Sequence, residues 1–262
     1  MSMIRELDRL LLCVGLAHGL LALVCALLLR VDATPILGLH PALKPLKFAF
    51  SIALFLITTA VLLPSLSVSD TTRRGLSALL AVTMVAEMTV IGAQALRGRR
   101  SHFNLEQPLD SALVRVMLVG IVVLLLVMVG IAVIATARPL RASDALTMSG
   151  LMTAAWRAAL WLFLFAAVSG LGMGGRLAHT VGGADGGPGM ALTNWSTTHG
   201  DLRVSHFFAL HSLQIIPLAA VAISRLPLGG GARWGLLALT VCVNGVLALW
   251  TLLQALAARP VW

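Results

Sequence analysis

Four polar side chains that could take part in chemistry follow one another in the stretch NWSTTHGDLRVSHFFALHSLQIIPL, which becomes strongly apolar. They are Arg203, His206, His211 and Gln214, and on an α-helix they would share a wedge of about 140° over about 16 Å of its axis. An imidazole serves as acid, base or metal ligand, and a guanidinium binds anions. We therefore predict that this helix lines a polar pocket, with His206 and His211 as candidate catalytic residues and Arg203 as an anion-binding residue.

The spacing of the two histidines bears on metal binding. His206 and His211 are five residues apart, whereas a pair that clamps one zinc ion on a helix is spaced i, i+4. A metal here would need a ligand from another segment, and His102 is the leading candidate. Haem or a transition metal ligated by His102, His206 and His211 is one interpretation, and a metal-free acid or base is the other.

A second group of polar residues closes the third apolar segment, in EMTVIGAQALRGRRSHFN. Glu87 and Gln94 are seven residues apart and lie on one helix face, which Arg97 extends to the membrane surface. Glu87 is the acidic residue deepest in any apolar segment, and an intramembrane carboxyl is by default a functional candidate. The alternative is a buried hydrogen bond that holds two helices together.

A third group, HPALKPLKFAFS, leads into the second apolar segment. Its two prolines, Pro41 and Pro45, are expected to end regular structure before the helix, which puts Lys44 and Lys47 near the first turn. Two ammonium groups beside a helix N-terminus favour a phosphate or carboxylate, and Ser51 would face the same way. The alternative is that both lysines reach the lipid head groups and anchor the helix.

The three connections that carry these groups hold most of the distinctive polar residues. Five of the seven histidines lie in or beside them, His211 lies about two turns into the membrane below them, and His18 is the exception. We therefore predict one composite site on one membrane face. Its remaining polar lining is predicted to comprise Ser101, Asn104, Asn194 and Asp201.

The composition indicates which elements position these residues. The chain of 262 residues is 59% hydrophobic and 11% charged, far less charged than a soluble domain. Taking about 20 apolar residues as one membrane crossing, we predict an all-α, polytopic protein with one transmembrane domain over residues 1–262. The predicted spans are approximately 9–30, 46–66, 76–97, 112–136, 149–171, 203–223 and 234–257.

The excess of positive charge indicates contact with a membrane and not with nucleic acid. The formal net charge is +9, and no nucleic-acid-binding motif is present. The lipid bilayer, together with an anionic small molecule or lipid head group, is the expected partner. Excess Lys and Arg on the face opposite the predicted site, once the four proposed anion-binding residues are set aside, favour a cytoplasmic N-terminus and an extracytoplasmic site in a bacterial plasma membrane. The three cysteines are widely spaced and indicate neither a disulfide framework nor a thiolate metal site.

Three segments also carry a resemblance. QALRGRRSHFN, NWSTTHGDLRVSHFFALHSLQIIPL and KPLKFAFS resemble the hallmark segments of an uncharacterised bacterial family of seven-span membrane proteins. The resemblance implies a shared site and no particular activity, cofactor or substrate.

Four functions fit these residues. The first is a haem- or metal-dependent membrane oxidoreductase or enzyme that binds an anionic or lipid-like ligand. The second is a metal-free lipid enzyme in which histidine acts as acid or base. The third is a proton-coupled transporter or channel for a small solute. The fourth is a structural subunit whose polar groups join helices.

Overall fold

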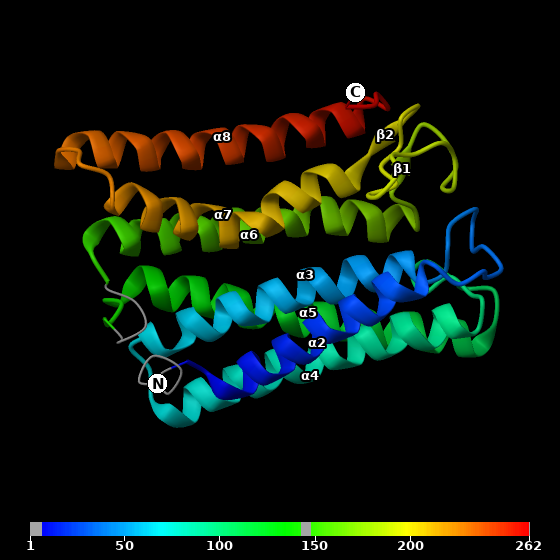
Figure 1. The fold of residues 1–262 in the computed structure, drawn as a ribbon, viewed down its shortest axis with the longest axis horizontal. Helices are drawn as coiled ribbons and strands as arrows, with labels where there is room; N and C mark the ends of the chain where they lie inside the picture. The colour runs from blue at the N-terminus through cyan, green and yellow to red at the C-terminus, as the bar shows by residue number, and fades with distance from the viewer. Residues whose placement is uncertain (1–6, 143–147, 262) are drawn as a thin grey trace. The chain divides into compact units, whose positions relative to one another are not determined.

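The computed structural model describes residues 7–142 and 148–261, and these residues form an all-α protein (Figure 1). The α-helices are α2 (Arg9–Leu28), α3 (Leu43–Leu62), α4 (Asp70–Leu96), α5 (Pro108–Ala137), α6 (Gly150–Arg176), α7 (Leu202–Ser224) and α8 (Gly230–Leu256). A short 3-10 helix, Leu63–Ser65, follows α3, and two short strands, β1 (Thr180–Val181) and β2 (Gly200–Asp201), lie between α6 and α7.

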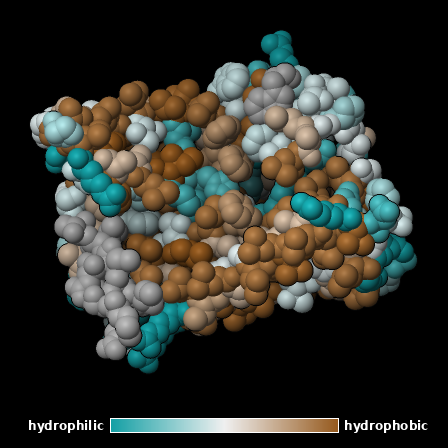
Figure 2. Space-filling model, viewed as in Figure 1, coloured by the Kyte–Doolittle hydropathy of each residue, from teal (hydrophilic) through white to brown (hydrophobic). Residues whose placement is uncertain are grey.

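Seven helices in the described part of the chain are long and apolar enough to cross a membrane. Large apolar side chains are exposed along them, among them Leu27, Leu126 and Leu218, and Figure 2 shows apolar surface over much of the face in view. Such a surface is stable in lipid and unfavourable in water. The chain is therefore an integral membrane protein with seven transmembrane helices, as the sequence predicted.

The helices form two compact units, and each is described by itself. Unit 1 comprises residues 3–64 and 68–127, of which residues from 7 onward are described. Helices α2 and α3 pack closely at Gly15, where an added Cβ would lie 2.9 Å from Cγ1 of Ile57. Asp8 caps α2 by accepting a hydrogen bond from the Leu11 amide, and Ser77 of α4 donates to the same carboxylate at 2.6 Å. These contacts fix the polar end of α2 against α4.

Unit 2 comprises residues 65–67 and 128–262, described up to residue 261. Its central helix, α7, contacts both α6 and α8 through small side chains that include Ala166, Ala209 and Ala248. Two buried serines of α7 donate to backbone carbonyls of the neighbouring helices: Ser212 to Ala159 at 3.1 Å and Ser205 to Ala248 at 2.7 Å. Strands β1 and β2 pair antiparallel, with Thr180 opposite Asp201.

Several helix ends differ from the sequence-based prediction. Helix α4 begins at Asp70 instead of residue 76, because the Ser69 hydroxyl accepts from the Thr72 amide and caps it. Helix α6 continues to Arg176, past the predicted end at residue 171, and stops where Leu177 adopts a left-handed conformation with φ of 51°. The expectation that Pro45 precedes its helix was wrong, since α3 begins at Leu43. Proline is tolerated in a first turn, where its missing N–H has no helical acceptor.

Candidate functional site

The predicted site residues fall into two groups, one in each unit. Lys44, Lys47, Ser51, Glu87, Gln94, Arg97, Ser101, His102 and Asn104 belong to unit 1, and Asn194, Asp201, Arg203, His206, His211 and Gln214 belong to unit 2. The contacts within each group are described in turn.

In unit 1, His102 lies between a cation and a buried acid. The Lys44 ammonium is 3.1 Å from His102 Nδ1, and His102 Nε2 is 3.5 Å from Oε1 of Glu87. An ammonium group can only donate, so Nδ1 accepts and the ring proton is carried by Nε2, which faces the carboxylate. The three side chains come from α3, from the connection after α4, and from α4 itself. We call this arrangement the Lys44–His102–Glu87 chain.

Glu87 is the most deeply placed member of that chain. The residue is 4% exposed, and its second oxygen, Oε2, is buried without a hydrogen-bond partner among the described residues. Its position nine residues before the end of α4 corresponds to a depth of about 14 Å. An oxygen that is buried without a donor is costly when the group is charged, so this site favours a carboxyl that binds a proton.

Aromatic rings surround the imidazole of His102. The Phe48 ring is 5.3 Å from it, centroid to centroid, and the Phe103 ring is 5.9 Å from it in an edge-on arrangement. The Lys44 ammonium also lies 5.6 Å from the Phe48 centroid. The Ser101 hydroxyl is 3.1 Å from His102 Nδ1. These neighbours restrict the ring to the orientation that links Lys44 with Glu87.

A second contact set in unit 1 joins the end of α4 to the start of α5. Arg97 donates to Oδ1 of Asp110 at 2.8 Å and to the side-chain oxygen of Gln94, while the Gln94 amide donates to the same Asp110 oxygen at 3.0 Å. Asp110 is fully buried in the first turn of α5, where the helix dipole favours an acid. Gln94 and Arg97 therefore lie on one helix face as predicted, and both are bonded to the Asp110 carboxylate of this chain.

Asp110 was not among the residues predicted for the site. The available signal was an acid two residues after the helix-starting Pro108 and thirteen after Arg97. Asn104 closes the same connection, donating to the Arg100 carbonyl and accepting from the Glu106 amide. The two other predicted residues on α3 are Lys47 and Ser51, and both are half-buried.

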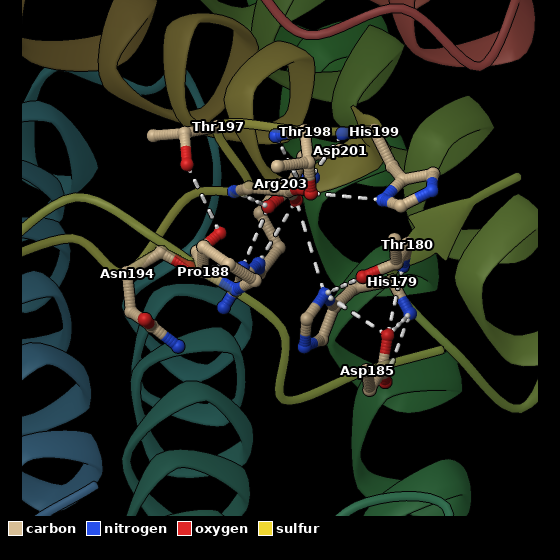
Figure 3. Close-up of polar contacts among 11 residues, drawn as sticks. His179, Thr180, Asp185, Pro188, Asn194, Thr197, Thr198, His199, Asp201 and Arg203 are labelled. Atoms are coloured by element: carbon tan, nitrogen blue, oxygen red, sulfur yellow. Dashed lines mark hydrogen bonds and ion pairs between the residues drawn. The ribbon is translucent and has the colours of Figure 1, made fainter. Parts of the chain in front are cut away.

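In unit 2, Arg203 is held by the residue that caps its own helix (Figure 3). Its guanidinium donates to both oxygens of Asp201, at 2.9 Å and 2.6 Å, and also to the Asn194 carbonyl. Asp201 further accepts from the backbone amides of Arg203 and Ser196. Burial alone would raise the pKa of Asp201, but the bonds and charge of Arg203, the Ser196 amide and the nearby His179 outweigh it and hold the pKa below its usual value.

A histidine between two carboxylates lies beside this pair, and the site prediction did not include it (Figure 3). His179 Nδ1 is 3.3 Å from Asp185 and 4.0 Å from Asp201. Asp185 also accepts from the amides of His179 and Thr180, which shapes the turn after β1. The sequence placed His179 in the polar connection but gave no periodicity that would pair it with Asp185 across a glycine-rich loop.

The two intramembrane histidines of α7 have neutral partners. His206 Nδ1 is 2.9 Å from the Ala166 carbonyl of α6, and His211 Nδ1 is 3.2 Å from Oε1 of Gln214. Both partners are acceptors, so each Nδ1 carries the proton and each Nε2 presents a lone pair. Each is therefore arranged as a neutral imidazole with an available ligand atom.

His102, His206 and His211 were the predicted metal ligands. Over residues 7–142 and 148–261, no group of three or more His, Cys, Asp or Glu side chains is placed to hold a metal ion. His102 belongs to unit 1, whereas His206 and His211 belong to unit 2. The three-histidine metal site and the single composite site stay predictions.

No family model, curated protein or solved structure matches the chain. The resemblance to a bacterial seven-span family therefore stays a prediction, and function is argued from the geometry alone.

Proposed function

We propose that this protein moves protons within the membrane, with Glu87 as the group that binds and releases them. The single observation that carries the proposal is the Lys44–His102–Glu87 chain, in which a buried carboxyl is joined to a half-buried ammonium through one imidazole. The protein would couple this proton transfer to the passage of a small solute, and Lys44 with Lys47 would attract an anionic group to the mouth of the path.

The imidazole suits this role because its two nitrogens exchange protons independently. In loading, a proton leaves the Lys44 ammonium for Nδ1 while Nε2 releases its proton to Oε1 of Glu87. The products are a neutral lysine, a neutral histidine and a protonated Glu87, and the lysine regains its proton from water. No charge remains unpaired in the hydrocarbon at the end of the step, which lowers its cost. In unloading, Lys44 first releases a proton to water, and then Nδ1 returns its proton to Lys44 while Nε2 takes the proton from Oε1 of Glu87.

The test is infrared spectroscopy of the protein in lipid. A protonated carboxyl gives a carbonyl band, and Glu87→Gln should remove it. In His102→Phe the band should persist. The exchange of the Glu87 carboxyl proton for deuterium from D₂O should slow by at least about tenfold, because the proton must then pass between Glu87 and Lys44 without the imidazole as a carrier. Glu106→Gln is the matched control, since that acid is largely exposed and bonded to Arg99 and Arg100. Unchanged exchange in His102→Phe would end the proposal.

A second candidate function is a haem- or metal-dependent oxidoreductase that binds an anionic or lipid-like ligand. The observation that favours it is His206, whose Nδ1 is fixed by the Ala166 carbonyl while Nε2 keeps its lone pair. Ligating histidines commonly have this second hydrogen bond. A bound haem would supply electron transfer, and His206 would be the residue that holds its iron. An absorbance spectrum and metal analysis test it: a Soret band or bound metal lost in His206→Ala and kept in His199→Ala supports it, and the absence of both in the purified protein contradicts it.

We also propose a bacterial plasma membrane with the N-terminus in the cytoplasm. This orientation rests on the distribution of lysine and arginine between the two faces. A cysteine introduced at Gly187, in a background without the three native cysteines, should react with an impermeant maleimide added to intact cells. Labelling that requires lysis would reverse the orientation.

A further inference from the structure

We propose that the exposed face of α7 binds the ring of a membrane-soluble phenol or quinol. The ring hydroxyl would donate to His211 Nε2, the ring would lie against Phe207, and an apolar tail would follow the helix. This site is in unit 2 and goes beyond the proton path of unit 1, on which it does not depend.

His211 is hydrogen bonded through one of its two ring nitrogens. Among the described residues, its one hydrogen bond is the 3.2 Å contact from Nδ1 to Oε1 of Gln214. Since the amide oxygen accepts, Nδ1 donates and Nε2 is left as an acceptor without a donor in this part of the chain. The residue is half-buried, so the lone pair can be reached from outside the helix packing.

The lone pair of His211 Nε2 lies well below the membrane surface. His211 is nine residues into α7, which corresponds to a depth of about 14 Å from the start of the helix. Water is scarce at such a depth, and an acceptor without a donor is unfavourable there. Protonating the ring instead would bring a charge into hydrocarbon at greater cost. The favoured partner is a neutral molecule that dissolves in the membrane and carries an O–H group.

An aromatic surface lies beside the imidazole of His211. The centroid of Phe207 is 4.4 Å from that of His211, and 40% of Phe207 is exposed. Trp195 meets Phe207 edge-on at 5.3 Å, and Phe208 does so at 5.7 Å. Aromatic rings associate at such centroid distances, and an exposed ring offers a further face for stacking. A hydroxyl on an aromatic ring satisfies both the lone pair and the ring surface.

An apolar strip continues from His211 along the helix. At about 100° per residue, Phe207, His211, Ile215 and Leu218 fall within about 80° of one another on α7. Ile215 and Leu218 are exposed, and Leu218 lies about 10 Å further along the axis than His211. This strip fits a hydrocarbon tail attached to the ring. A quinol with a prenyl tail is the natural ligand class with these three parts.

The experiment compares two probes that differ in one hydrogen-bond donor. The full chain in lipid nanodiscs, labelled with ¹⁵N-histidine, is titrated with 4-decylphenol and with 4-decylanisole, whose oxygen carries a methyl group and cannot donate. We expect the His211 Nε2 resonance to shift saturably with the phenol, and the anisole to bind about tenfold more weakly. Equal affinity for the two probes would overturn the proposal.

Variants separate the parts of the site. His211→Phe should abolish the preference for phenol over anisole, whereas Phe207→Leu should weaken both probes and keep the preference. Phe50→Leu is the matched control, because Phe50 is an exposed phenylalanine of α3 in unit 1, and it should change neither affinity. A preference that survives in His211→Phe overturns the proposal, as does a His211 resonance that responds to Zn²⁺ and not to the phenol. The wild-type comparison remains decisive if a variant fails to fold.

Discussion

Unit 1 and unit 2 use the same residue type with different neighbours. His102 in unit 1 lies between the Lys44 ammonium and the Glu87 carboxylate, both of which can exchange protons with it. His206 and His211 in unit 2 instead donate to a backbone carbonyl and to an amide oxygen, neither of which takes up a proton at physiological pH. The comparison indicates that the hydrogen-bond partners of a histidine decide its role in this chain. Partners that exchange protons favour a proton carrier, and partners that only accept favour an imidazole that presents a lone pair to a ligand.

Each unit also has a buried aspartate at the start of a helix, and this aspartate forms an ion pair with an arginine. In unit 1, Asp110 of α5 holds Arg97 from the end of α4. In unit 2, Asp201 caps α7 and holds Arg203 two residues further along the same chain. Asp201 therefore combines an ion pair with a helix cap, whereas Asp110 joins two successive helices.

The largest expected effect distinguishes these two aspartates. Asp201→Ala should lower the free energy of unfolding by about 3–5 kcal/mol, because it removes the cap, takes the carboxylate away from the Arg203 guanidinium and leaves the Ser196 amide without its acceptor. Asp110→Ala should lower the melting temperature less, since fewer donors lose their partner. Thermal unfolding in detergent, followed by circular dichroism, measures both. Equal losses would show that the cap of α7 adds nothing.

The next effect compares two glycines at close approaches, one in each unit. A Cβ on Gly200 would lie 2.1 Å from the Ala255 carbonyl oxygen, a backbone atom of α8, so Gly200→Ala should cost about 3 kcal/mol. A Cβ on Gly15 would meet the side chain of Ile57, which can move, so Gly15→Ala should cost about 1 kcal/mol. The same melting experiment ranks the two. Gly92→Ala, where nothing lies within 4 Å, serves as the control.

The pH dependence of unit 2 should follow Asp201. Its pKa is lower in the folded protein than in the unfolded chain, so the unfolded chain binds more protons in acid. The stabilisation is thus fully present above about pH 4 and is lost as the pH falls through the lowered folded pKa. Amide exchange at Ser196 and Arg203 should accelerate over that range. In Asp201→Asn this acid-dependent acceleration should be absent, and its persistence would assign it to another group.

The smallest effect concerns His206. His206→Ala removes the hydrogen bond to the Ala166 carbonyl and should destabilise unit 2 by about 1 kcal/mol. Ser205→Ala, which removes a bond of similar length to the Ala248 carbonyl, provides a reference for an ordinary interhelical contact. A much larger loss in His206→Ala would mean that the imidazole supports more than this contact.

Sequence reasoning located the helices well because their lengths and hydropathy are set by the membrane. It also found Glu87 and the stripe of Gln94 and Arg97, since helical periodicity alone places those side chains on one face. It missed Asp110 as the partner of Arg97, and it missed the contact between His179 and Asp185. Both contacts depend on the conformation of an irregular connection, and no periodic pattern in the sequence predicts that conformation.

Asp201 and Arg203 are only two positions apart in the sequence, which bears on how α7 enters the membrane. A pair this close in sequence can form while the segment is still entering the bilayer, before α7 packs against any other helix. The pair that follows α4 requires residues 97 and 110 to meet, so the turn between two successive helices must be made first. Helix α7 can therefore be inserted with its cation already neutralised, whereas α4 and α5 are best inserted together as a hairpin.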